Sequence, residues 1–424
     1  MNLLKKLNSP IKAIIFSMVL WSIAYIFHTH SYTIILKSNG IFILAIYVIA
    51  FILGATFLKV IERNKESLEV SHEGTYNKKW INTLIILSII GLLTKGYDLI
   101  VNKNYLSYSG SSDFKSNYTG NSFNFISLIS ALLFPMALLL LLAYIDDKKS
   151  FEKKQKIAVW ANFGGIILFS VAIGTRTQIT FIAVAVLFIF FSKKLNLSKS
   201  KKIKIIAFIS VFLIGFFFYS VTILSDRLQY QKKNTSDALI YLEKMHHVDL
   251  DDFIWNFLDN NVVSGEIIYA TVSLRHYLIH GIYQFQLLVD VFDTDNIAYG
   301  QYQFNPIFKG LSLLGVSYRT IGNIENFVPE SGVYSTFFGD VYIDFGIYGF
   351  IYMFFLGVIS QMIFSRRNNK NYKLMYSIIY SIILHMFFIN MISYAMGLYF
   401  IISFILGLYI VPKFIRGGIV VEKT

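Results

Sequence analysis

The chain contains no cysteine in its 424 residues, and it is poor in charged side chains. The absence of cysteine excludes disulfide bonds and metal sites built on thiolates. Only 15% of the residues are Asp, Glu, Lys or Arg, whereas ordinary globular domains contain roughly 25%. Because 55% of the residues are hydrophobic, too few charges remain to cover a water-soluble body of this size. Lipid must therefore form part of the solvent.

The formal net charge of +13 comes mostly from short runs of Lys and Arg between apolar segments. Such runs are typical of the cytoplasmic loops of membrane proteins. We therefore expect no nucleic-acid partner. No period of about 20–50 residues repeats along the chain, so a solenoid is not indicated.

A hydrocarbon core of about 30 Å requires about 20 apolar residues in a helix. The sequence therefore predicts an all-α polytopic membrane protein with about ten transmembrane helices and one large extracytoplasmic loop. The stretch 157–192 is divided at residues 174–178, because a lipid-exposed Arg176 in mid-span would be costly. The predicted spans are 11–29, 41–58, 80–101, 125–145, 157–173, 178–192, 203–224, 343–364, 373–392 and 395–412.

Lys and Arg are abundant in alternate loops, and the positive-inside rule places those loops in the cytoplasm. The rule predicts that both termini are cytoplasmic, together with the basic loops near 59–79, 148–156, 193–204 and 366–373. Abundant Ile, Lys, Asn, Phe and Tyr suggest a bacterium with an AT-rich genome. We therefore expect a multi-pass protein of the bacterial cytoplasmic membrane.

Three regions follow from this reading: an N-terminal transmembrane bundle (1–224), an extracytoplasmic loop domain (225–342) and C-terminal transmembrane helices with a cytoplasmic tail (343–424). The loop domain contains seven Lys and Arg against fourteen Asp and Glu, so its charge differs in sign from that of the whole chain. Its apolar stretch 262–292 carries several ionisable residues, which makes a lipid-facing span unfavourable. We expect this stretch to lie along the membrane or dip into it.

Three arginines fall on the predicted outer side: Arg176, Arg275 and Arg319. A guanidinium holds a phosphate through paired donors and does not deprotonate, which suits a lipid diphosphate. Each arginine alone could equally be an interfacial anchor for lipid headgroups or for a carboxylate of the loop.

His276 and His280 are four residues apart, and so they share one face if the segment is helical. The pair could bind a metal, or one member could act as a general base on a sugar hydroxyl. A metal site needs further ligands, and the chain contains no HExxH pattern, so an ordinary interfacial role stays open. Glu330, Glu266 and Asp340 are competing bases.

Several other charged residues are weaker candidates. The outer pairs Asp249/Asp251 and Asp293/Asp295 resemble metal-binding Asp-x-Asp patterns, but such pairs arise easily in an acidic loop. Near the outer end of the third span, we expect Lys95 and Asp98 to form an internal pair; Lys95 stays a secondary functional candidate. Asp340 and Asp344 lie at the predicted membrane edge and are further secondary candidates.

The late motif Tyr342-Ile343-Asp344-Phe345-Gly346-Ile347-Tyr348-Gly349 enters the eighth predicted span. This Tyr-x-Asp-Phe-Gly-x-x-Gly entry resembles the oligosaccharide repeat-unit polymerases called Wzy, the O-antigen polymerase family. The turn at Gly174-Thr175-Arg176 and the long outer loop before the last spans are similar to theirs too. The arginine-then-glycine spacing described for some such polymerases is absent, since eleven residues after Arg275 is Gln286 and eleven after Arg319 is Glu330.

The resemblance implies a membrane glycosyltransferase (GT-C-like) architecture and an enzyme, and it implies neither a cofactor nor a metal, although the two Asp-x-Asp pairs keep a metal open. The implied enzyme joins oligosaccharide repeat units, carried on undecaprenyl diphosphate, into a capsule or other surface polysaccharide on the outer face of the membrane. The implied partners are the lipid-linked donor and acceptor, the lipid bilayer, a chain-length regulator and a flippase. The alternatives are an O-antigen ligase-type transferase and a lipid-linked oligosaccharide flippase or other transporter. Transporters usually show internal repeats and ionisable groups at mid-membrane, neither of which this sequence displays.

Overall fold

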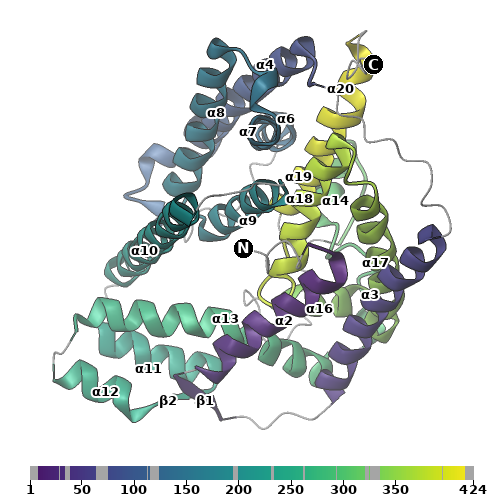
Figure 1. Ribbon diagram of the computed structural model, residues 1–424. Coiled ribbons are helices and arrows are strands. Elements are labelled where there is room, and N and C mark those ends of the chain that lie inside the picture. Colours follow the sequence, from purple (N-terminus) through teal and green to yellow (C-terminus); the bar gives the residue numbers. More distant parts are fainter. Residues whose placement is uncertain are drawn as a thin grey trace.

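The computed structural model describes residues 8–27, 29–33, 39–63, 75–111, 113–114, 124–193, 199–230, 234–260, 263–292, 294–319, 324, 335–393 and 395–415. Apart from one two-stranded sheet, these residues form an all-α protein (Figure 1). The helices are α2 (Pro10–Ile26), α3 (Asn39–Arg63), α4 (Lys78–Tyr97), α6 (Phe125–Leu133), α7 (Met136–Asp146), α8 (Lys153–Ala172), α9 (Arg176–Ser192), α10 (Lys199–Tyr230), α11 (Thr235–His246), α12 (Asp252–Asp259), α13 (Gly265–Val291), α14 (Asn305–Ser312), α16 (Thr336–Phe345), α17 (Gly349–Ser365), α18 (Lys370–His385), α19 (Ala395–Ile405) and α20 (Val411–Phe414). The strands are β1 (His30–Tyr32) and β2 (Val248–Leu250).

Seven helical segments in the described residues are long and apolar enough to cross a membrane, and α2 and α9 are shorter apolar helices. The chain is therefore a multi-pass membrane protein by helix length and hydropathy. The predicted ninth span, 373–392, differs: α18 ends at His385 and the chain continues in turns as far as residue 393. At 1.5 Å per residue, the 16 residues of α18 span about 24 Å, which is shorter than the hydrocarbon core.

The predicted break within 157–192 is confirmed, because α8 ends at Ala172 and α9 begins at Arg176. Gly174 has φ +66°, a left-handed conformation that favours glycine, and a Cβ there would lie 2.9 Å from Ser111 Oγ. Thr175 donates its hydroxyl to the Ser170 carbonyl at 3.1 Å, which closes the turn. The turn places Arg176 at the start of a helix rather than within one.

Helices α3 and α17 pack against each other extensively, and glycines set their spacing. A Cβ on Gly54 would overlap the carbonyl oxygen of Phe354, and a Cβ on Gly357 would overlap that of Phe51. Small residues let two membrane helices approach until their backbones touch, where dispersion contacts replace a hydrophobic driving force. This contact fixes α17, which follows the motif at 342–349.

Loops that the charge pattern assigns to the same side lie at the same end of the bundle. Lys370 pairs with Asp147 at 2.8 Å and Lys373 pairs with Asp146 at 2.8 Å, which joins the α17–α18 turn to the α7–α8 turn. Lys193, at the end of α9, donates to the carbonyl of Ile145 beside them. We call this the basic end.

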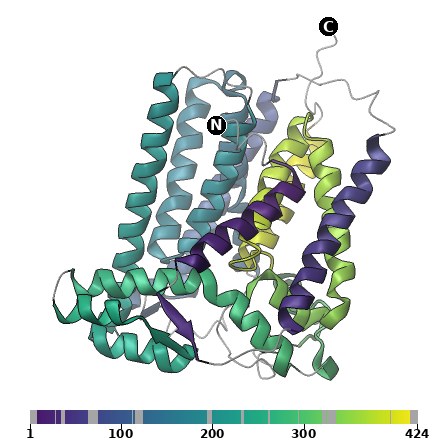
Figure 2. The same ribbon diagram turned by 60° about the horizontal axis from the view of Figure 1, so that its bottom comes forward.

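The opposite end is covered by the cap, which we define as α11, β2, α12 and α13 within residues 234–292. Figure 2 shows α13 lying across the ends of the upright helices rather than parallel to them. The cap has a small hydrophobic core of its own, and β1, between α2 and α3, pairs antiparallel with β2. The predicted loop domain 225–342 thus contains a folded unit. Its boundaries differ from the prediction, because α10 extends to Tyr230 and α16 begins at Thr336, before the predicted span.

The membrane sidedness can be tested by cysteine labelling, since the chain has no native cysteine. We expect Lys149→Cys and Asn368→Cys, at the basic end, to be shielded from a membrane-impermeant maleimide added to intact spheroplasts. Tyr241→Cys on the cap and Asp295→Cys should react, because both positions are exposed and belong to the predicted outer side. Reaction of Lys149→Cys with protection of Tyr241→Cys would invert the topology. Labelling after detergent lysis is the control for accessibility.

Candidate functional site

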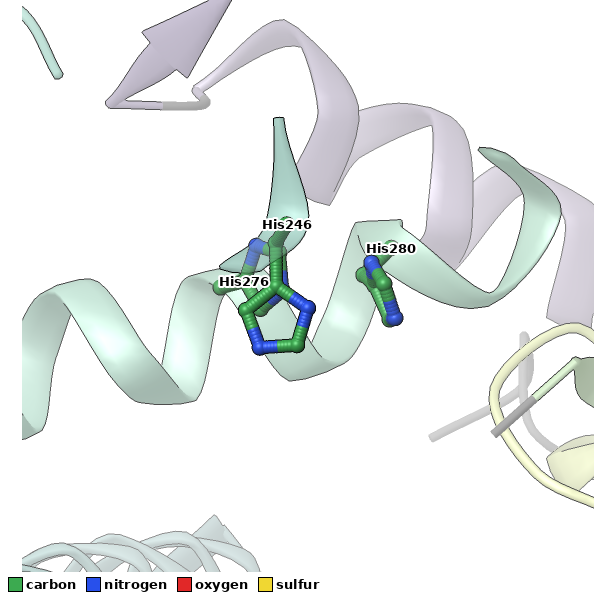
Figure 3. A group of neighbouring side chains, drawn as sticks. All are labelled: His246, His276 and His280. Atoms are coloured by element: carbon green, nitrogen blue, oxygen red, sulfur yellow. The ribbon is translucent and has the colours of Figure 1, made fainter. Parts of the chain in front are cut away.

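Three histidines come together between α11 and α13: His246, His276 and His280 (Figure 3). One ring nitrogen from each lies within 4.8 Å of the others. The ring centres of His276 and His280 are 4.3 Å apart, and that of His246 lies 4.6 Å and 5.0 Å from them. Among the described residues, these histidines form the one group of three or more His, Asp or Glu side chains whose geometry could hold a metal ion.

A fourth imidazole comes from strand β1. His30 on β1 is fully buried, and its Nε2 lies 3.4 Å from Nδ1 of His276. The strand is held in place by pairing with β2, where His30 lies opposite Leu250, and by stacking of Tyr32 on Tyr283 at 3.8 Å. We call the four residues His30, His246, His276 and His280 the histidine cluster.

Burial determines the charge state of the cluster. His276 and His280 are each only 3% exposed. Burial, together with the neighbouring imidazoles, holds the pKa of His276 and that of His280 well below the usual range for histidine. Both rings are therefore neutral at pH 7, which is the form of imidazole that binds metals.

The predicted arginines do not gather at one point. Arg176 lies over the Tyr277 ring on α13, with the guanidinium carbon 5.4 Å from the ring centre, so the α8–α9 turn is in contact with the cap. Arg275 is half-buried, two residues earlier on the same helix and therefore on a different face. Arg319 lies elsewhere, with its Nη1 near the carbonyls of Asn296 and Ile297 at 3.5 Å and 3.4 Å.

Asp344 and Asp340 of α16 accept hydrogen bonds in a buried network. The carboxylate of Asp344 accepts the backbone N–H groups of Tyr302 at 2.9 Å and Gln303 at 2.6 Å. That of Asp340 accepts Ser335 Oγ at 3.0 Å, Asn390 Nδ2 at 2.8 Å and Ser393 Oγ at 2.5 Å. The Asn390 amide also donates to Gln303 at 2.5 Å, which links the two carboxylates through one chain of contacts. Asp344 thus holds the 302–303 backbone, and Asp340 holds three side chains.

An apolar groove lies beside this network, at the corner between α16 and α17. It is open to the surface, and its aromatic walls include Tyr348 and Phe355, which are 67% and 57% exposed. Arg319 contacts the carbonyl of Ile297, a wall residue. The aromatic groove is lined by Ile297, Tyr299, Asp344, Phe345, Tyr348, Ile351, Tyr352 and Phe355.

The remaining candidates are scattered. Glu330 and Asp293 lie outside the described residues, while Asp249, Asp295 and Glu266 are exposed and Asp251 caps α12. The expected Lys95–Asp98 pair is not the ion pair that forms: Asp98 pairs with Lys103 at 2.6 Å. The physical reason is a π-helical turn at Asp98–Asn102, which carries Lys103 back to the carboxylate.

The histidine cluster contains two residues that the sequence reading missed, His30 and His246. The signal present in the sequence was the His276/His280 spacing, which identifies two ligands on one helix face. His30 is 246 residues from His276 along the chain, and single-sequence periodicity carries no information on such a contact. Strand β2 begins two residues after His246. The pairing of β1 with β2 therefore brings both His30 and His246 to the cluster.

Comparison with protein-family models, with curated proteins and with solved structures finds no match to the chain. The geometry of the described residues is therefore the basis for assigning a function.

Removing the Asp344 carboxylate should destabilise the protein. Two buried backbone donors would be left unsatisfied, which costs about 1–3 kcal/mol for each donor. We expect Asp344→Ala to lower the midpoint of thermal unfolding in detergent by several degrees. Asp249→Ala, on an exposed position of β2, is the matched control and should leave the midpoint unchanged. An unchanged midpoint in Asp344→Ala would contradict the anchoring role.

Proposed function

We propose that the protein is a polymerase that joins undecaprenyl-diphosphate-linked oligosaccharide repeat units into a surface polysaccharide on the outer face of the cytoplasmic membrane. The observation that carries the proposal is the position of the 342–349 motif. Asp344, Phe345 and Tyr348 of this motif line the aromatic groove. The motif that carries the resemblance therefore forms part of a surface suited to lipid.

The groove matches the chemistry of a polyprenyl chain. Its walls are aliphatic and aromatic, and α16 and α17 belong to a segment apolar enough to span the membrane. A lipid tail entering from the bilayer would therefore exchange one apolar environment for another. Arg319, at the Ile297 wall, is positioned to meet the diphosphate at the end of such a chain.

The two arginines at the cap supply cationic groups for the second lipid-linked substrate. Arg176 projects from the start of α9, where the helix dipole also favours an anion. Arg275 lies two residues before Tyr277 on α13, on another face of the helix from the one that Arg176 contacts. A polymerase binds a donor and an acceptor, both carrying diphosphates, and so two separate cationic regions fit this reaction.

The reaction breaks the bond between the anomeric carbon of the donor glycan and its diphosphate, and forms a glycosidic bond to a hydroxyl of the acceptor. The bonding electrons leave with undecaprenyl diphosphate, and the hydroxyl proton passes to a base. Donors aimed at the diphosphate stabilise the charge that develops there. The energy comes from the glycosyl–diphosphate bond, so the reaction requires no nucleotide.

The base role of His276 and His280 stays a prediction, and their burial weighs against it. A sugar hydroxyl must come within hydrogen-bond reach of its base, and each ring is 3% exposed. Glu330 remains the competing candidate, twelve residues before the Tyr342 that opens the motif.

Arginine variants test the proposed reaction directly. Purified protein reconstituted with lipid-linked repeat units should make polymer, seen as a ladder on a gel. We expect Arg176→Ala, Arg275→Ala and Arg319→Ala to lower turnover by about 10²-fold or more, the effect typical of a lost anion-stabilising donor. Arg366→Ala, at the basic end, is the control and should polymerise at the native rate. Native polymer from all three outer variants would remove the arginine assignment, and no polymer from the native protein would favour a transporter.

A bulky residue in the aromatic groove tests lipid binding separately. Ile351 lines the groove and is 46% exposed, and Ile359, two turns later on α17, has the same exposure outside it. We expect Ile351→Trp to raise the KM for the lipid-linked unit by roughly tenfold or more, because the indole fills space that the chain needs. Ile359→Trp should leave the KM unchanged. Equal KM values for the two variants would exclude the groove as the lipid site.

A further inference from the structure

Within the part of the chain that the structure describes, several buried ring nitrogens of the histidine cluster lack a hydrogen-bond partner. Nε2 of His276 and both ring nitrogens of His280 have no hydrogen-bond partner in the described residues. Two buried hydroxyls also lack a hydrogen-bond partner among the described residues: Ser273 Oγ, one turn before His276, and Thr29 Oγ1, next to His30. A buried polar atom without a partner costs about 1–3 kcal/mol, and native structures contain few of them. The three nitrogens on the neighbouring rings of His276 and His280 indicate a ligand that satisfies them together.

The donor set favours a cation over an anion, and the close approach of three ring nitrogens favours a single ion over a larger ligand. Neutral imidazole nitrogens present lone pairs, and a ring has at most one N–H to donate. Three imidazoles from two elements have nitrogens within 4.8 Å of one another, which leaves a common point between them. We propose that His246, His276 and His280 bind a divalent transition-metal ion at this point, with Zn²⁺ as the occupant.

Small side-chain rotations suffice to form the site. Zn–N bonds of about 2.1 Å place the ligand nitrogens of a tetrahedral site about 3.4 Å apart. His276 and His280 already share one face of α13 at a spacing of four residues, the arrangement that paired helical metal ligands use. Imidazole ligands suit Zn²⁺, Cu²⁺ and Ni²⁺, whereas Mg²⁺ and Ca²⁺ prefer oxygen.

His30 supports the site as a positioning residue. With His276 binding the metal through Nε2, its Nδ1 donates to His30 Nε2, which lies 3.4 Å away. Ligating histidines nearly always donate their second N–H to such a partner, which fixes the tautomer and the ring orientation. The ion thereby joins α11 to α13, and His30 extends the connection to β1 and the N-terminal helix.

The proposal does not rest on the glycan reaction, although a bound ion would remove His276 and His280 as its base, and the test measures metal directly. Full-length protein is purified in detergent with a tag that contains no histidine, stripped with chelator and titrated with Zn²⁺ against a chromophoric chelator. We expect one tightly held Zn²⁺ per chain. Co²⁺ in its place should give the intense visible absorption of a tetrahedral site.

Variants assign the ion to the cluster. His246→Ala, His276→Ala and His280→Ala should each lower the Zn²⁺ affinity by more than 100-fold, and His30→Ala by about 10–100-fold, the range for a lost outer partner. The matched control is His247→Asn, the exposed neighbour of His246, which has φ +50°, a conformation that Asn tolerates. It should bind Zn²⁺ as the native chain does.

Two results would overturn the proposal. One is a native chain that takes up no more Zn²⁺ than the His276→Ala variant. The other is loss of binding in His247→Asn equal to that in His246→Ala, which would place the ion outside the cluster. His280→Gln keeps nearly the volume of the side chain and replaces the alanine variant if that variant unfolds, as judged by circular dichroism. Zn²⁺ should raise the unfolding midpoint of the native chain but not that of His280→Gln.

Discussion

The carboxylate of Asp344 is the constraint on which the motif region depends. Near the end of α16 it accepts two backbone N–H groups of the 302–303 turn, while the carbonyls of Ile343 and Asp344 accept those of Ala298 and Tyr299. A loop bound through four backbone donors cannot slide along the helix without losing all four contacts. Ile297 and Tyr299, which form one wall of the aromatic groove, are therefore fixed relative to Tyr348 and Phe355 on the other. The Asp344 carboxylate and the two carbonyls beside it thus hold the two walls of the groove together.

The buried network behind Asp344 explains why α18 is shorter than its hydropathy predicts. Residues 386–393 are apolar enough to continue a span, yet Asn390 lies among them and donates to Asp340 and to Gln303. Irregular backbone at membrane depth is tolerated where protein covers it, and Ile389, Met391 and Ile392 are all buried. Ending the helix at His385 lets the Asn390 amide reach both partners. Hydropathy reports the environment of this segment correctly, but it carries no information on its conformation.

Charge patterning predicted more of the architecture than any single motif. The division at residues 174–178 rested on the cost of Arg176 in mid-span, and Gly174 does adopt the left-handed turn there. The common location of the basic loops is likewise visible in the Lys370–Asp147 and Lys373–Asp146 pairs. The histidine cluster was half predicted, because His276 and His280 belong to one helix whereas His30 and His246 arrive through a strand pairing. The three arginines share a predicted side but not a site, since residues on one face of a membrane can be anchored to different loops.

α13 connects the histidine cluster to the motif region, and this connection gives the cluster a consequence beyond local stability. His280 and Phe285 are five residues apart on one continuous helix, a rise of about 7.5 Å. Phe285 and Phe292 each lie 6.2 Å from the ring of Tyr342, the first residue of the motif, and Leu288 is buried against Gly339 one turn earlier. Trp21 on α2 donates to the Ile279 carbonyl, so the N-terminal helix is attached to α13 between the two histidines. A helix is stiff over this length, and so a displacement of the α13 backbone at His276 and His280 would carry Phe285 with it. The packing of α13 within the cap therefore bears on the contacts that Phe285, Leu288 and Phe292 make with the motif helix.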